Sequence, residues 1–149
     1  MLKNRLLLIS IITIIFIAVF HYLALKNSWY WTVKWIDIPV HILGGFWVAI
    51  TVLWISLNIK HIDSINGYKK RALLVMLIPV LVVGISWEIF ELIFKITNLH
   101  DVGYWSDTLS DILNGFIGGI IAFLYFTKNK KAKSSVMDKN VAHDFVVIL

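Results

Sequence analysis

The sequence predicts an all-α integral membrane protein in which four transmembrane helices form a bundle and both termini lie in the cytoplasm. Hydrophobic residues make up 59% of the 149 positions and charged residues only 15%, whereas about a quarter of the residues of a soluble domain are charged. The apolar residues gather in four long stretches, and the basic residues lie mostly at the ends of those stretches. The lipid bilayer is therefore the expected environment, and no nucleic acid is expected as a partner.

Four apolar spans follow one another along the chain, over residues 6–25, 36–57, 72–96 and 109–126. A helix needs about 20 residues to cross the core of a bilayer, and it satisfies its own backbone hydrogen bonds there. The first span follows Lys3 and Arg5 as a signal peptide would, but it is long for one and no clear cleavage site follows, so we expect a retained anchor. Residues 1–127 are then the membrane domain, and residues 128–149 a mobile, basic cytoplasmic tail.

The basic residues predict the orientation of the bundle. Eleven of the 14 lysine and arginine residues precede the first span, separate the second from the third, or follow the fourth. Cytoplasmic segments of membrane proteins carry the excess of positive charge, so this side should face the cytoplasm. The opposite side receives His21, His100 and the aromatic residues Trp29, Tyr30, Trp31, Trp35, Tyr104 and Trp105. Aromatic rings with polar tips are typical of the headgroup layer, so we interpret this set as interfacial.

Polar side chains gather at the outer ends of the spans, where lipid-spanning helices normally carry few. They are Asp37 and His41 in the second span, Glu88 and Glu91 in the third, and Asp107, Asp111 and Asn114 in or just before the fourth. A carboxylate at membrane depth is costly, so it normally faces a partner, a cavity or a ligand. The sequence therefore predicts that these residues converge on one pocket in the outer half of the bundle.

Glycines lie on the same helix faces as these polar residues, closer to the middle of the membrane. They are Gly44 and Gly45 in the second span and Gly115, Gly118 and Gly119 in the fourth. Small residues at helical spacing let two helices approach closely. We therefore expect the second and fourth helices to pack through these glycines, below the polar pocket.

Several of the polar residues also have a purely structural interpretation. Asp37 could cap the second helix, and the sequence Thr108-x-x-Asp111 fits a capping box at the start of the fourth. Glu91 stands one turn before Lys95, in the order that favours an ordinary ion pair on a helix. These alternatives would leave the polar residues as structural elements of the bundle.

Glu88 and His41 are the candidate catalytic residues, because no basic residue lies within one turn of Glu88 and His41 lies one turn inside its helix. The candidate ligand-binding residues are Asp37, Asp107, Asp111, Asn114 and Glu91. Carboxylates with one imidazole suit a divalent cation, Mg²⁺, Mn²⁺, Ca²⁺ or Zn²⁺, and its candidate ligands are Glu88, His41, Asp111 and Asp37. The chain has no cysteine, which excludes thiolate ligands and nucleophiles.

The motifs resemble those of a known family. Residues 36–126 contain Asp37-x-x-x-His41-x-x-Gly44-Gly45, then Trp87-Glu88-x-x-Glu91, then Asp107-Thr108-x-x-Asp111-x-x-Asn114-Gly115. This pattern resembles the YjdF-type small membrane proteins and, more distantly, the VanZ-like family, from which it departs at Ile38, Glu91 and Gly115. The VanZ-like resemblance implies a role at the bacterial cell envelope, where that family is associated with glycopeptide resistance, and it implies Asp37, His41, Glu88, Asp107 and Asp111 as motif positions.

Three functions remain open from the sequence. The first is binding or processing of a cell-envelope lipid or small ligand in the outer-leaflet pocket, with help from a metal ion. The second is a non-catalytic accessory or structural subunit, in which the polar cluster holds the helices together. The third is proton- or ion-coupled transport, since intramembrane carboxylates and histidines commonly carry ions. A chain of four helices is small for a transporter, so this third function would favour a homo-oligomer.

Overall fold

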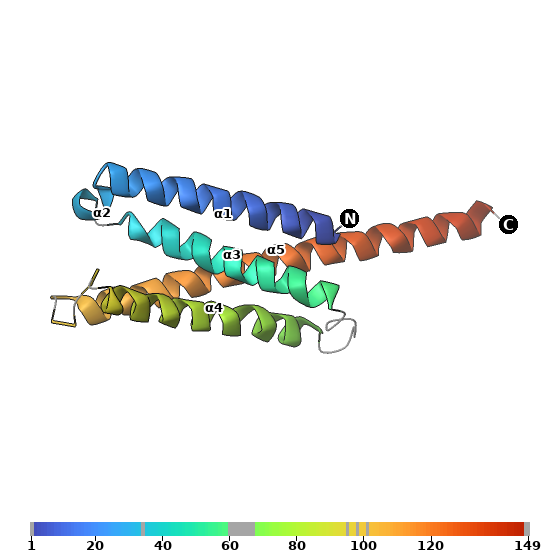
Figure 1. Cartoon of the computed structure of the whole chain (residues 1–149). Helices are drawn as coiled ribbons and strands as arrows, with labels where there is room; N and C mark the ends of the chain where they lie inside the picture. Colours follow the sequence, from blue (N-terminus) through green and yellow to red (C-terminus); the bar gives the residue numbers. More distant parts are fainter. Residues whose placement is uncertain are drawn as a thin grey trace.

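The computed structural model describes the chain over residues 2–33, 35–59, 68–94, 96–97, 99–100 and 102–147, with side chains for these residues except 68 and 130–147. The described residues form five helices and no strand. They are α1 (Leu2–Lys26), α2 (Trp29–Thr32), α3 (Asp37–Asn58), α4 (Tyr68–Ile93) and α5 (Tyr104–Val147). The four long helices lie roughly along one direction, and the short α2 joins α1 to α3 at one end (Figure 1).

Four of the helices are long and apolar enough to cross a membrane, so the predicted all-α fold with four membrane-spanning helices is confirmed, while the cytoplasmic location of the termini stays a prediction. The membrane-spanning stretches are Leu2–Lys26, Asp37–Asn58, Lys69–Ile93 and Tyr104–Asn129. Large apolar side chains on the outer faces of these helices are exposed, among them Ile15, Ile78 and Leu124. Such faces suit contact with lipid, because nothing else in the bundle covers them.

The fourth transmembrane helix begins earlier than the sequence predicts and continues further. α5 begins at Tyr104, directly after Gly103, whose φ of 92° lies in the left-handed region that favours glycine. The hydroxyl of Ser106 donates a hydrogen bond to the Gly103 carbonyl at 2.8 Å and stabilises this turn. The helix then continues to Val147, through the region predicted as a tail. The mobility of that region stays a prediction.

α3 is the central helix of the bundle. It packs most extensively against α5, and it also contacts α1 and α4. In Figure 1, α1 lies on one side of α3 and α4 on the other. α3 and α5 both begin at the end of the bundle where α2 lies, so they run parallel to each other (Figure 1). The end of the bundle that contains α2 also contains the first residues of α3 and α5 and the last residues of α4. We call it the polar end.

Glycines make the close contact between α3 and α5, as the sequence predicts. A Cβ atom added at Gly45 would overlap the backbone carbonyl of Gly115, and one added at Gly118 would overlap the backbone at Ile42. Gly119 faces α4 instead, where an added Cβ would lie 2.8 Å from Leu77 Cδ2. The expectation for Gly44 was wrong, because an added Cβ would meet nothing within 4 Å there. The axes of α3 and α5 lie close together because Gly45 and Gly118 face the neighbouring helix without a side chain.

The apolar core fills the other end of the bundle. Its buried side chains come from all four long helices and are Leu6, Val48, Ala49, Ile50, Leu53, Ala72, Met76, Val80, Ala122 and Phe126. One polar contact, at 2.7 Å between the hydroxyl oxygens of Ser10 and Thr51, joins α1 to α3 beside this core. Packing in this half therefore rests on apolar side chains and one hydroxyl pair.

Candidate functional site

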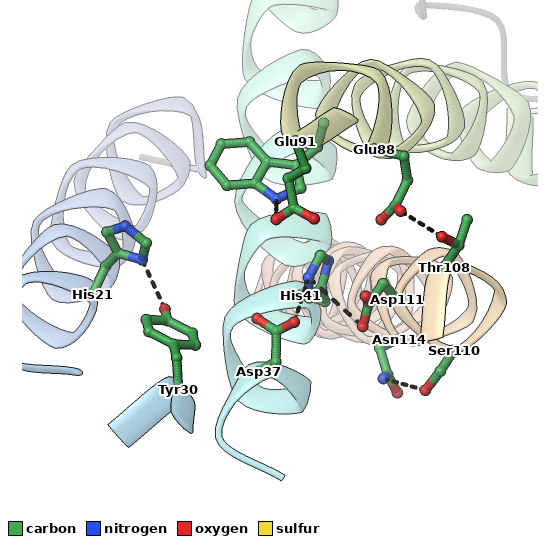
Figure 2. Close-up of polar contacts among 11 residues, drawn as sticks. His21, Tyr30, Asp37, His41, Glu88, Glu91, Thr108, Ser110, Asp111 and Asn114 are labelled. Atoms are coloured by element: carbon green, nitrogen blue, oxygen red, sulfur yellow. Dashed lines mark hydrogen bonds and ion pairs between the residues drawn. The ribbon is translucent and has the colours of Figure 1, made fainter. Parts of the chain in front are cut away.

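Two carboxylates and one imidazole converge at the polar end (Figure 2). His41 Nε2 lies 3.3 Å from Asp37 Oδ2 and 3.7 Å from Asp111 Oδ1. One possible ligand atom from each of the three residues lies within 4.8 Å of the other two. We call these three residues the triad. Asp111 is buried, with 7% of its surface exposed, whereas Asp37 and His41 are partly buried.

The glycine contact explains why the triad forms. Asp37 and His41 are four residues apart in α3, so they share one face of the helix. His41 precedes Gly45 by one turn, and Asp111 precedes Gly115 by one turn. Because α3 and α5 run parallel and touch at these two glycines, the residues one turn earlier face each other. The close helix approach thus places an α5 carboxylate against an α3 imidazole.

The two capping interpretations are wrong. The N-cap position of α3 is Ile36, and no side chain caps that helix end; Asp37 is its first residue and pairs with His41 instead. α5 begins at Tyr104, so Thr108 lies inside the helix and Asp111 one turn further along, where neither can form a capping box. Capping therefore does not account for Asp37 or Asp111.

Glu88 is buried beside the triad, with 7% of its surface exposed. Its Oε2 accepts a hydrogen bond from the Thr108 hydroxyl at 2.7 Å, which joins α4 to α5 (Figure 2). Glu88 is not among the three residues whose ligand atoms lie mutually within 4.8 Å. It is close enough for its charge to act on His41 and Asp111. Its assignment as a metal ligand or catalytic group stays a prediction.

The other predicted site residues surround this group. Glu91 Oε1 accepts a hydrogen bond from the indole N–H of Trp87 at 2.8 Å, while Lys95, its expected partner, lies outside the described residues. Asn114 is half-buried, and its amide donates to the Ser110 hydroxyl at 3.3 Å.

Asp107 is exposed at the start of α5, one turn before Asp111, and its charge acts on Asp111. Together with other residues around that helix start it lines a hollow of about 350 Å³, whose lining is Thr97, Val102, Gly103, Tyr104, Ser106 and Asp107. This hollow includes no member of the triad, so Asp107 belongs to a neighbouring surface of the polar end.

Two polar contacts at this end were not predicted from the sequence. Thr108 was assigned to a cap, although its hydroxyl supports Glu88. Tyr30 and His21 were assigned to the interface, but the Tyr30 hydroxyl oxygen lies 2.7 Å from His21 Nδ1 (Figure 2). Burial, followed by the charges of Asp37 and Glu91, raises the pKa of Tyr30 to about 12. The phenol is therefore neutral at physiological pH and lies near these two carboxylates.

The fold and this cluster define a small multi-pass membrane protein with a group of two carboxylates and one imidazole at one end of its bundle. The family model described as "Predicted membrane protein (DUF2238)" matches residues 2–132, and the chain belongs to this family. The resemblance to YjdF-type proteins is confirmed by this match, whereas similarity to the VanZ-like family is not shown by it. No curated protein and no solved structure matches the chain.

Proposed function

We propose that the triad holds a divalent metal ion at the outer face of the membrane, and that the ion binds the headgroup of a cell-envelope lipid or a small ligand. The observation that carries this proposal is the convergence of one imidazole nitrogen and two carboxylates from two different helices. A membrane helix pair rarely places ionisable groups this way without a function for them.

The distances within the triad fit a shared ion. Zinc ligands lie about 2.0–2.2 Å from the metal, so neighbouring ligand atoms are roughly 3–3.6 Å apart. The separations from His41 Nε2 are 3.3 Å to Asp37 Oδ2 and 3.7 Å to Asp111 Oδ1. Small side-chain adjustments would therefore suffice to place the three atoms around one ion, and further coordination positions would be left for a ligand.

The charge of the cluster also supports a bound cation. Four carboxylates, those of Asp37, Glu88, Glu91 and Asp111, act on the single His41 ring. Among the described residues, the ion pairs recorded for this cluster are the two that involve His41. Buried carboxylates need a proton or a positively charged partner, and a protonated imidazole would supply only one positive charge for the four. A divalent cation would supply the missing positive charge.

The ligand types favour particular metals. An imidazole nitrogen suits Zn²⁺ and other transition metals, whereas Mg²⁺ and Ca²⁺ take oxygen ligands almost alone. Three protein ligands with an open fourth position are also the arrangement of catalytic zinc sites. We therefore expect Zn²⁺ or Mn²⁺ to bind more tightly than Mg²⁺ or Ca²⁺. Glu88, held by Thr108, lies where it could act as a further ligand or accept a proton from a bound group.

Metal binding to the purified full chain tests this proposal. After chelation and reloading, mass spectrometry of the metal content should find about one Zn²⁺ or Mn²⁺ per chain, and calorimetry should give its affinity. His41→Ala and Asp111→Asn should each weaken binding by about tenfold or more, since each removes a ligand. Asp138→Asn is the matched control, because Asp138 lies in the part of α5 beyond the membrane-spanning stretch that ends at Asn129, and it should leave the affinity unchanged.

The same measurements separate this function from an accessory role. If His41 only bridges α3 and α5 as a charged side chain, the wild type will bind none of the four cations, and His41→Ala will lower thermal stability alone. The lipid part has its own readout. Lipids that copurify with the metal-loaded protein should be released by chelation, and lipids retained equally with and without metal would contradict that part.

A further inference from the structure

α1 reaches the polar end although it contributes no member of the triad. The chain leaves α1 at Lys26 and reverses at Ser28, whose φ of 58° lies in the left-handed region. A residue other than glycine rarely adopts this conformation, so the surrounding contacts must hold it. The reversal folds α2 back against α1 and brings Tyr30 next to His21, with a distance of 2.7 Å between the hydroxyl oxygen and Nδ1.

Aromatic rings pack α2 onto α1 in addition to the contact of the Tyr30 hydroxyl with His21. The rings of Phe20 and Trp29 already join the two helices, with centroids 6.2 Å apart. The rings of Tyr30 and His21 add a second aromatic contact, with centroids 5.4 Å apart. A phenylalanine at position 30 would keep both contacts. The hydroxyl therefore adds a polar group to an interface that aromatic rings already hold together.

In Figure 2 this hydroxyl lies on the α1 side of the triad, across from α4 and α5. The charges of Asp37 and Glu91 both act on the phenol, which places it near a carboxylate of α3 and a carboxylate of α4. A neutral phenol has one donor hydrogen and acceptor lone pairs. The hydrogen bond with His21 uses either the donor hydrogen or one lone pair of the phenol, and the other remains for a hydrogen bond with a ligand.

The surroundings also indicate what kind of ligand would fit. Ionised carboxylates only accept hydrogen bonds, so a group that lies among them must donate. The two charges of a divalent cation would already be matched by its carboxylate ligands Asp37 and Asp111, which disfavours a further anionic ligand such as a phosphate headgroup. Neutral hydroxyl groups satisfy both conditions, because each donates to a carboxylate and its oxygen can bind a cation.

We propose that Tyr30, held by His21, is a positioning residue that hydrogen-bonds a hydroxyl-bearing headgroup of the sugar or glycerol type on the cation at the triad. This inference rests on the cation site proposed above. It gives α1 and α2 a direct part in ligand recognition. A purely structural role would be limited to the contacts between these two helices.

A titration of the Co²⁺-loaded full chain tests the inference, in a detergent without a sugar headgroup. The probes are octyl glucoside below its micelle concentration and monooctyl phosphate, which share a tail and differ in the headgroup. Changes in the Co²⁺ absorption spectrum report ligand binding at the metal. In the wild type we expect octyl glucoside to bind more tightly than monooctyl phosphate. Tyr30→Phe should weaken octyl glucoside binding about five- to tenfold, as expected for one lost hydrogen bond, with Co²⁺ affinity within about twofold of the wild type.

Two further variants make the result specific. Tyr22→Phe is the matched control, because Tyr22 is an exposed tyrosine of α1 and should change neither affinity. His21→Ala should weaken octyl glucoside binding as well, and adding it to Tyr30→Phe should cause little further loss, since the two residues act as a unit.

The outcomes distinguish this inference from the cation site on which it rests. A wild type that binds no Co²⁺ would overturn both. Co²⁺ binding with monooctyl phosphate preferred, or with octyl glucoside affinity unchanged in Tyr30→Phe, would overturn this inference alone. If Tyr30→Phe fails to fold or loses Co²⁺ binding, the hydroxyl has a structural role, and this inference is overturned too.

Discussion

The contact between α3 and α5 has two parts with opposite chemistry. In its middle, Gly45 and Gly118 allow backbone to touch backbone, and no side chain intervenes. One turn closer to the polar end, the same two helices bring His41 against Asp111. The glycines alone account for the close packing. The contact thus combines direct backbone packing with an ion pair between the same two helices.

The two ends of the bundle also treat charge differently. At the end opposite the triad, Lys3, Arg5, Lys69, Lys70 and Arg71 are all exposed, as charged residues normally are. At the polar end, Glu88 and Asp111 are each only 7% exposed. Burying a carboxylate costs free energy unless it is paired. The two ends therefore differ in kind: one carries exposed basic side chains, and the other carries buried carboxylates that pair with His41 or Thr108.

The prediction with the largest expected effect concerns the orientation of the bundle in the membrane. We predict that the polar end faces away from the cytoplasm, because the basic residues gather at the other end. A reporter active only in the cytoplasm should give a signal when fused at position 64 and none when fused at position 100. A cytoplasmic signal at position 100 would reverse the orientation and place the triad on the inner face.

Gly118→Leu should prevent the bundle from folding. Its side chain would overlap the backbone of α3 at Ile42, and a backbone cannot move aside as a flexible side chain can. Size-exclusion chromatography should show little monodisperse protein. Ile120→Leu is the control, because Ile120 is exposed on the same helix and should behave as the wild type. A well-folded Gly118→Leu variant would mean that α3 and α5 are not in close contact there.

Thr108→Val should have a smaller effect on stability. It removes the hydroxyl that donates to Glu88 and leaves a buried carboxylate oxygen without that partner, at a cost of about 1–3 kcal/mol. Thermal unfolding should detect this loss. Thr127→Val is the matched control, since its hydroxyl donates only to an exposed carbonyl of its own helix. Equal melting temperatures for the two variants would show that Glu88 does not depend on Thr108.

The sequence was sufficient for the all-α fold with four membrane-spanning helices and for the convergence of polar residues at one end of the bundle. Spans of apolar residues follow directly from the requirement for self-contained backbone hydrogen bonding in lipid. The i,i+4 spacing of Asp37 and His41 and the glycines below them also allowed their convergence with Asp111 to be expected. These inferences succeeded because they depend on positions within one helix and on the total length of each span.

Other features depend on how the helices rotate against one another, which no single span encodes. The Thr108 hydroxyl bonds to Glu88 of another helix, and a local capping pattern in the sequence concealed that contact. The start of α5 is set by the left-handed Gly103, several residues before the apolar pattern begins. Gly44 and Gly45 are neighbours in sequence, yet only Gly45 faces α5.

X-ray absorption at the zinc edge tests the central claim most directly. The Zn²⁺-loaded wild type should show one imidazole and oxygen ligands at about 2.0–2.2 Å, because His41 is the only imidazole of the triad. In His41→Ala the imidazole signal should disappear, while in Asp138→Asn it should stay. An imidazole signal that survives His41→Ala, or a wild type that retains no zinc after dialysis, would contradict the proposed metal site.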